Sequence, residues 1–243
     1  MSNSFWCCRS LDMEQIKCYG DQRNKGFCVH CGGLYETDDH VPSKVLLDEP
    51  YPENLIVCPS CLSCNNLLSK DEAYVACLLE CVLAGDADPA RLHRPKIARL
   101  LEGNPALLKR LQTARSQGTS EPIWSIESDR VRTIVLKLAR GHAAYEYNEP
   151  RLEAPAHIEF KPLISMQEPE REVFEGSSDA GMASWPEVGT RAMGRLLVVG
   201  SRVFDEGWIV VQEGNYRFRV SQEDGLTVKI VLREYLACRV VWE

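Results

Sequence analysis

Apolar residues recur every three or four positions in two parts of the chain, 69–84 and 129–147, which is the spacing of a buried helix face. The first part, 69–84, begins with Ser-Lys-Asp-Glu, a capping box that predicts a helix start, and Gly85 follows as a stop signal. A shorter helix is expected to open just before it, near Cys64. The apolar face of the longer helix consists of Tyr74, Cys77, Leu78, Cys81 and Val82.

Three further helices follow, at 88–102, 104–115 and 129–147. The first two begin with Asp-Pro and Asn-Pro, a cap followed by proline in the first turn. An interruption is expected near Pro95. The last helix shows the regular spacing of a buried stripe, and a histidine near its end, His142, is expected to be packed or exposed rather than a ligand.

The end of the chain changes to the alternating period of β-strands. Before it, the stretch 149–185 is rich in Pro, Glu, Ser and Gly, with one short strand expected at 158–160 and a flexible linker or long loop at 166–184. Turn residues join neighbouring strands as hairpins. The expected strands of the tail are 196–199, 208–211, 216–220, 226–232 and 237–242.

These patterns predict an α+β protein with four regions. Residues 1–85 are expected to hold a compact metal-stapled module, and 86–150 a helical middle region. Residues 151–190 form a linker or long loop, and 191–243 form an antiparallel β-sheet or partial barrel.

Two Cys-x-x-Cys pairs, Cys28/Cys31 and Cys61/Cys64, are the strongest chemical signal in the chain. Four thiolates at such spacings complete the tetrahedral shell of a structural zinc ion. The 29 residues between the pairs exceed the usual finger spacing, so they are expected to hold structure of their own. Cys58 lies close enough in sequence to compete as a ligand.

Composition and charge narrow the class of protein. The 243 residues carry a net charge of −7 and a hydrophobic fraction of 44%, which is ordinary for a globular protein and argues against a general nucleic-acid coat. No apolar run approaches the ~20 residues of a membrane span, and no signal peptide is evident, so a cytoplasmic location is expected. An odd number of cysteines, 11, does not suggest a disulfide framework.

The residues between and after the cysteine pairs carry a resemblance. The chain reads Asp39-His40-Val-Pro-x-Lys, then Asn54-Leu, then Cys61-x-x-Cys64-Asn65-Asn, then Ser-Lys-Asp-Glu. In this combination, over about residues 26–72, it resembles bacterial HNH endonucleases with a zinc-stapled ββα-metal site.

The resemblance implies a role for each polar residue. His40 would be the general base that activates water, a role that suits a neutral imidazole near pH 7. Asp39 and Asn65 would hold a catalytic Mg²⁺ or Mn²⁺, and Asn54 would tie the loop and orient the base. In a regular strand, the side chains of Asp39 and His40 point to opposite faces, so the backbone is expected to bend there.

Simpler interpretations stand beside these roles. Asp39 or Asn54 could be an ordinary turn residue, and His40 a structural zinc ligand. Asp38 could take the place of Asp39 as a ligand of the catalytic cation, and Asn66 could take the place of Asn65. His30, inside the first cysteine pair, is expected to be exposed on its turn. Lys44 and Lys70 are either phosphate contacts or surface charges.

A basic stretch lies beyond the module. Between 91 and 115 there are seven Lys or Arg residues and one acidic residue. Either this is a solvated helix face, or it contacts phosphates through Arg91, Arg94, Lys96 and Arg99. The alternating aromatic and basic residues of 216–220 are a weaker hint of a nucleic-acid platform.

Two functions follow as hypotheses. The first is a metal-dependent endonuclease that hydrolyses phosphodiester bonds in DNA, with RNA not excluded. The second is a catalytically silent, zinc-stabilised module that binds nucleic acid or protein within a larger bacterial assembly. Either would allow a protein partner or a homodimer, and neither involves a membrane.

Overall fold

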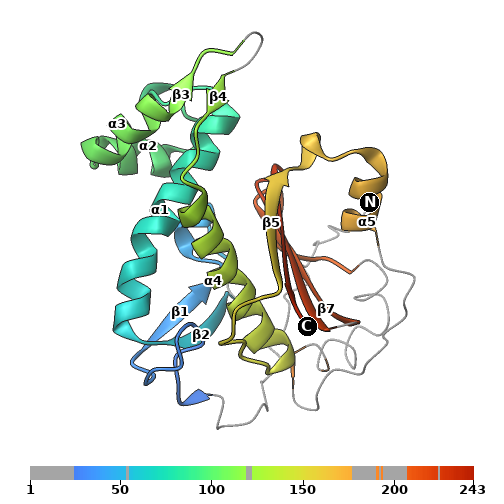
Figure 1. The fold of residues 1–243 in the computed structure, drawn as a ribbon. Helices are drawn as coiled ribbons and strands as arrows, with labels where there is room; N and C mark the ends of the chain where they lie inside the picture. Colours follow the sequence, from blue (N-terminus) through green and yellow to red (C-terminus); the bar gives the residue numbers. More distant parts are fainter. Residues whose placement is uncertain are drawn as a thin grey trace, which may run out of the picture.

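The structure is a computed structural model that describes residues 25–52, 55–118, 122–176, 190–191, 193, 207–223 and 225–243. It is an α+β protein, as the sequence predicts (Figure 1). The expected strand at 196–199 lies outside the described residues. No helix in the described part of the chain has both the length and the apolar character needed to cross a bilayer.

The first unit is an antiparallel hairpin of β1 (Thr37–Val41) and β2 (Ile56–Ser60). Thr37 pairs with Ser60 and Val41 with Ile56, and the register does not shift between them. One face of the hairpin is therefore buried and the other faces outward, because side chains alternate along each strand. A short 3-10 helix, η2 (Lys44–Leu46), lies in the connection between the strands.

A single helix, α1 (Leu62–Ala84), follows the hairpin directly. It ends at Gly85, which takes the left-handed conformation at φ +66°, as the sequence predicts. The expectation of two helices is wrong: the Ser69 hydroxyl donates to the carbonyl of Asn66 inside the helix and does not cap a new one. The helix begins earlier because the Cys61 thiol accepts from the N–H of Cys64 and supplies the N-cap.

The helical middle region follows the predicted order. A 3-10 turn, η3 (Pro89–Arg91), precedes α2 (Pro95–Glu102), which accounts for the expected interruption. Then come α3 (Pro105–Ala114), capped by the side chain of Asn104, and the long α4 (Ser128–Tyr147). Two short strands between these helices, β3 (Arg115–Ser116) and β4 (Ile123–Trp124), pair with each other.

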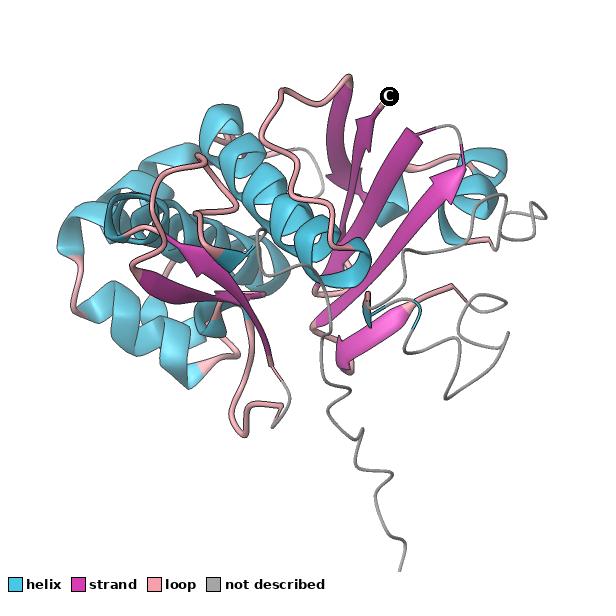
Figure 2. Ribbon diagram, turned by 90° about the horizontal axis from the view of Figure 1, so that it is seen from below, coloured by secondary structure: helices cyan, strands magenta, loops and turns pink. Residues whose placement is uncertain are grey.

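The second sheet has five antiparallel strands in the order β5-β9-β8-β7-β6. Tyr216, Phe218 and Val220 of β7 are buried on one face, as their alternation predicts. This face packs on α4, which separates the sheet from the hairpin and α1 (Figures 1 and 2). The strands are β5 (His157–Pro162), β6 (Ile209–Gln212), β7 (Tyr216–Glu223), β8 (Gly225–Leu232) and β9 (Leu236–Trp242).

The other face of this sheet is also covered in part. The expected linker at 166–184 contains helix α5 (Glu168–Glu175), so that expectation is wrong for these residues. The ring of Phe174 is buried in a small apolar cluster on the sheet, and Lys229 donates to the carbonyl oxygens of Val173 and Phe174. Residues 177–189 lie outside the described part.

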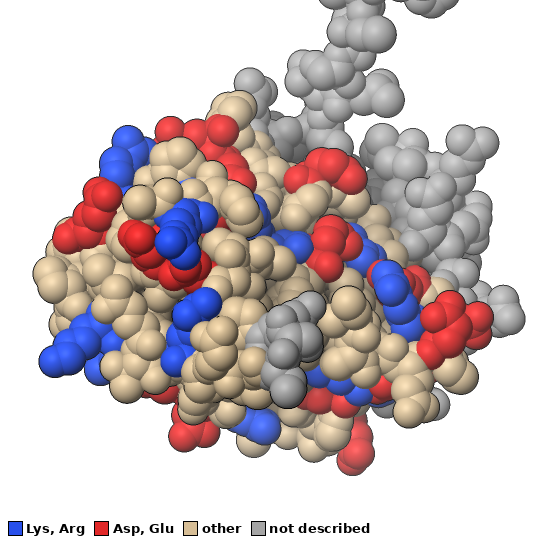
Figure 3. All heavy atoms as spheres, turned by 90° about the horizontal axis from the view of Figure 1, so that it is seen from above, with Lys and Arg blue, Asp and Glu red and all other residues tan. Residues whose placement is uncertain are grey.

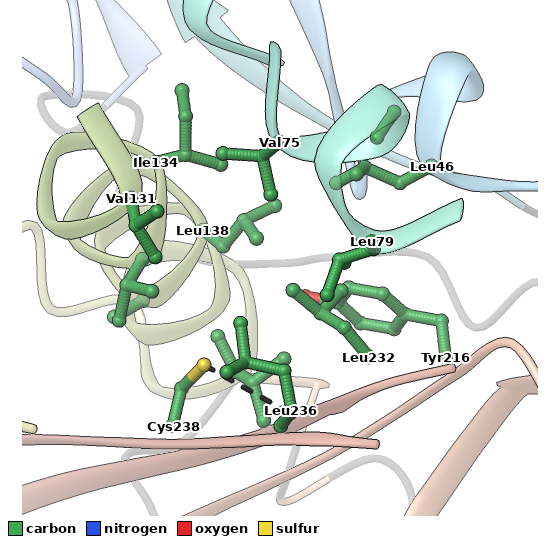
Figure 4. Packing of buried hydrophobic residues seen from close by; sticks show 14 of the residues in the cluster. Leu46, Val75, Leu79, Val131, Ile134, Leu138, Tyr216, Leu232, Leu236 and Cys238 are labelled. Carbon is green, nitrogen blue, oxygen red and sulfur yellow. Dashed lines mark hydrogen bonds between the residues drawn. The ribbon is translucent and has the colours of Figure 1, made fainter. Parts of the chain in front are cut away.

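One continuous apolar core joins the hairpin, α1, α4 and the sheet. Val75 and Leu79 of α1 approach Ile134 and Leu138 of α4, and the buried face of the sheet closes the cluster from the other side (Figure 4). The two halves are therefore held as a single packed body, and α4 is the element that both share.

Candidate functional site

Four cysteines from the two pairs gather at the start of α1: Cys28, Cys31, Cys61 and Cys64, whose sulfur atoms all lie within 4.8 Å of one another. The sulfur atoms of Cys31 and Cys61 are 3.7 Å apart. Four thiolates at about 2.3 Å from a tetrahedral zinc ion would be about 3.8 Å apart. The four cysteines can therefore hold a structural metal ion such as zinc.

The first pair lies on a tight turn. The N–H of Cys28 donates to the carbonyl of Gly33 over 2.7 Å, and Gly32 takes a positive φ of +75°. Burial raises the pKa of the Cys28 thiol, but hydrogen bonds from the backbone N–H groups of Cys61, His30 and Cys31 outweigh this effect, and the pKa falls to about 6. The pKa of Cys31 and of Cys64 is raised, so Cys28 is the thiol of these three that most readily forms the thiolate, the form that binds metal.

Cys58 is not part of this cluster. Its side chain is buried, and its thiol donates to the carbonyl of Gly141 in α4 over 3.3 Å. It joins the hairpin to α4 and leaves the metal to the other four cysteines. The remaining candidates at the start of the chain, Cys7, Cys8 and Cys18, lie outside the described residues.

His30, between the first two cysteines, is buried, which corrects the expectation that it is exposed. Its Nε2 atom lies 2.9 Å from Oδ2 of Asp39. Its carbonyl accepts a hydrogen bond from Arg140 of α4 over 2.7 Å. The metal-binding turn is therefore covered by α4, and the imidazole faces the hairpin.

Asp39 is buried on the inner face of β1, where both of its oxygens have partners. The ammonium of Lys137 in α4 lies 2.9 Å from each oxygen, and His30 shares Oδ2. Burial raises the pKa of Asp39. The hydrogen bonds and charges of His30 and Lys137 lower it by more, so the pKa lies below its usual value and the carboxylate stays ionised. The same ammonium also pairs with Glu72 of α1 and lies 3.3 Å from the hydroxyl of Ser43.

Lys137 is the residue that sequence reasoning missed. Only 1% of its side chain is exposed. The sequence feature that could have indicated it is a lysine next to Leu138 within the apolar stripe of 129–147. A lysine buried in such a stripe needs anionic partners.

His40 lies on the other face of β1, opposite Val57 of β2. The backbone bend that was expected at Asp39–His40 is absent, because the pairing of the two strands is regular there. Asp39 and His40 therefore do not share one site. Burial and, after it, the charge of Lys44 lower the pKa of His40, against the opposing charges of Asp39 and Asp38.

The His40 ring is half-buried and makes no hydrogen bond to any residue in the described part of the chain. Its pKa is lowered, so the imidazole is neutral at pH 7. A neutral, accessible ring nitrogen is what a general base needs.

Asn65 is half-buried in the first turns of α1, next to Cys64. Its backbone N–H donates to Cys61, and its side-chain amide has no hydrogen-bond partner among the described residues. The neighbouring Asn66 is exposed, and Asn54 lies outside the described residues.

Among the described residues, the four cysteines are the one cluster of possible metal ligands, and Asp39 is not part of it. A divalent ion bound to Asp39 would meet the ammonium of Lys137, which already neutralises this carboxylate. The side-chain amide of Asn65 has no hydrogen-bond partner among the described residues, but a single amide oxygen does not make a binding site for Mg²⁺ or Mn²⁺.

The basic stretch divides into internal and external side chains. Arg94 is buried and pairs with Asp48, and its NH2 group donates to the carbonyl of Leu47, so it is part of the scaffold. Arg91 is exposed but paired with Asp86, and Arg99 is exposed. Positive and negative side chains are interspersed over the face seen in Figure 3.

No protein-family model, curated protein or solved structure matches this chain.

Proposed function

We propose that this chain is an endonuclease of the HNH kind, which hydrolyses phosphodiester bonds in nucleic acid with His40 as the general base. The observation that carries the proposal is the state of His40: half-buried on the outer face of a rigid hairpin, with a lowered pKa and no hydrogen-bond partner among the described residues.

In the proposed reaction, a ring nitrogen of His40 takes a proton from water while the water oxygen forms a bond to phosphorus. The bond between phosphorus and the leaving oxygen breaks, and that oxygen takes up a proton. The four-cysteine cluster supports this chemistry indirectly, because it fixes the start of α1 against the turn that precedes β1. Alignment of this kind is a large part of catalysis.

A divalent cation, when bound in HNH enzymes, would neutralise charge on the phosphate. In this chain Asp39 is already paired with Lys137, and the proton transfer to His40 does not use this carboxylate.

The second candidate is a silent binding module, and the same ion pair favours it. A divalent cation at Asp39 would have to displace the ammonium of Lys137 and the imidazole of His30. Such a chain would keep the zinc-stabilised framework and bind without cleaving.

Cleavage assays separate the two candidates. Supercoiled plasmid, single-stranded DNA and RNA are incubated with the protein in chelator, Mg²⁺ or Mn²⁺. The matched variants are His40→Ala and His157→Ala, the latter an exposed histidine on β5. Cleavage by wild type and His157→Ala but not by His40→Ala supports the nuclease. No cleavage of any substrate, with zinc bound and the fold intact, supports the binding module.

A further inference from the structure

Two ammonium groups lie over the ring of Tyr51, in the connection between β1 and β2. Nζ of Lys96 is 4.8 Å from the ring centroid and Nζ of Lys44 is 5.7 Å from it. Lys44 belongs to η2 and Lys96 to the first turn of α2, so two segments far apart in the sequence bring their charges to one ring. Cation–π attraction holds such groups in place.

Neither lysine has a carboxylate within ion-pair distance among the described residues, although acidic side chains outnumber basic ones, 35 to 28. Lys96 donates only to neutral acceptors: the carbonyl of Lys44 and the hydroxyl of Tyr51, both over 2.6 Å, and the carbonyl of Leu47 over 3.4 Å. That hydroxyl in turn lies 3.2 Å from Glu49. Of the five arginines of this stretch, Arg91, Arg94 and Arg110 have acidic partners, whereas Arg99 and Arg115 form no ion pair with a described residue.

Two positive charges at one ring favour an anion there, although Glu49 and Asp48 already raise the pKa of Lys96. Burial lowers the pKa of Lys96, and the charge of Arg94 lowers it further.

The pair also lies next to the proposed base. Lys44 follows His40 by four residues, and it is the charged group with the largest effect on that imidazole. Its side chain is exposed and makes no hydrogen bond to a described residue, so it is free to meet a ligand.

We propose that Lys44, Lys96 and Tyr51 form a binding site for a backbone phosphate of a nucleic-acid strand, adjacent to the phosphodiester bond that faces His40. The inference rests on the proposed function and names the contact that would position the strand. Ammonium groups hold phosphate as point charges, so the site binds without regard to base sequence. Arg94, which the sequence suggested as a phosphate contact, is not part of this site because its side chain belongs to the scaffold.

Salt dependence of binding tests this site without any cleavage. A labelled DNA duplex is titrated with protein by fluorescence anisotropy at several salt concentrations, in a His40→Ala background that keeps the duplex intact. Each phosphate contact contributes about 0.9 to the slope of log K against log salt concentration. Lys44→Gln and Lys96→Gln are each expected to lower the slope by about that amount, and the double variant by about twice as much.

Arg132→Gln is the matched control, because it removes one exposed positive charge from α4, away from η2. Its slope is expected to equal that of the parent. Lys96 also supports the scaffold, so melting temperature and zinc content are measured for each variant. If Lys96→Gln does not fold, Lys44→Gln alone decides the question.

An unchanged slope and affinity in the folded double variant would overturn the inference, as would the absence of any binding to DNA. Equal competition by poly-glutamate would reassign the site to an acidic protein and overturn it too. Failure of the proposed function gives a different result. If wild type binds DNA in a lysine-dependent way but does not cleave it, the phosphate site is supported and the nuclease activity is not. If cleavage requires His40 but is unchanged when both lysines are replaced, the nuclease activity is supported and the phosphate site is overturned.

Discussion

Lys137 of α4 lies 2.9 Å from Asp39 of β1, although 98 positions separate them in the sequence. The same ammonium contacts Glu72 of α1, so one buried cation joins the hairpin, the helix that carries Asn65 and the helix that packs on the distant sheet. Two buried carboxylates of the first 85 residues therefore have their counter-charge on a residue outside this range.

Replacing Lys137 by methionine is expected to destabilise the protein by about 3–5 kcal/mol, because Asp39 and Glu72 would be left buried without a counter-charge. Urea unfolding measures the loss. The triple variant with Asp39→Asn and Glu72→Gln is expected to recover part of it, because neutral amides cost less to bury than unpaired carboxylates. Equal stability of the single variant and wild type would show that the pair contributes nothing.

The position of Lys137 shows where sequence reasoning stops. The apolar stripe of 129–147 predicts helix α4 and its buried face correctly. It does not show which acidic residues meet a lysine within that stripe, because both lie more than 60 positions earlier. The side chains of Asp39 and His40 point to opposite faces because they are neighbours in a regular strand. The backbone bend was expected only because the resemblance to HNH endonucleases places both side chains in one site.

Loss of the metal is expected to unfold the start of α1. Cys64→Ser, or a strong chelator, removes a ligand or the ion from a site whose four sulfurs lie within 4.8 Å of one another. Structural zinc contributes directly to folding, so the loss is expected to be several kcal/mol. Metal analysis should find one zinc per chain in wild type and none in the variant.

Cys58→Ser is the control for this experiment, because its thiol contacts Gly141 and not the cluster. It is expected to retain the zinc and to lose only a small part of the stability. A fully folded wild-type protein without zinc would contradict the assignment of all four ligands.

The same cysteines explain why the start of α1 could not be located from sequence. Ser-Lys-Asp-Glu at 69–72 has the composition of a capping box, but Glu72 is used by Ser43 and Lys137. The N-cap is Cys61 instead, a residue with no strong capping preference, and its role depends on the fold around the metal site. The strands of the tail, by contrast, follow from local alternation and turn residues, and β7, β8 and β9 match their predicted positions closely.

The rate of cleavage is expected to stay high below pH 6.5. His40 must be neutral to act as a base, and its lowered pKa moves the protonated, inactive form to lower pH. The rate should therefore fall only as the pH drops through a value below the usual 6.5 of histidine. Lys44→Gln removes a charge that lowers this pKa, so its profile should shift toward higher pH. A half-maximal rate above pH 7 in wild type, with zinc content constant across the series, would argue against His40 as the base.

The close approach of α4 to the hairpin gives a test of the scaffold itself. A Cβ atom at Gly141 would lie 2.5 Å from Cγ2 of Val41, so Gly141→Ala is expected to push α4 away from β1 and to cost about 1–3 kcal/mol. Val41→Ala in the same chain should relieve the clash and recover part of the loss, whereas Gly26→Ala, with open space around it, should change little. If α4 positions the hairpin for His40, the cleavage rate of Gly141→Ala should fall with its stability and return with the second substitution. Full activity in a destabilised Gly141→Ala would separate the packing of α4 from catalysis.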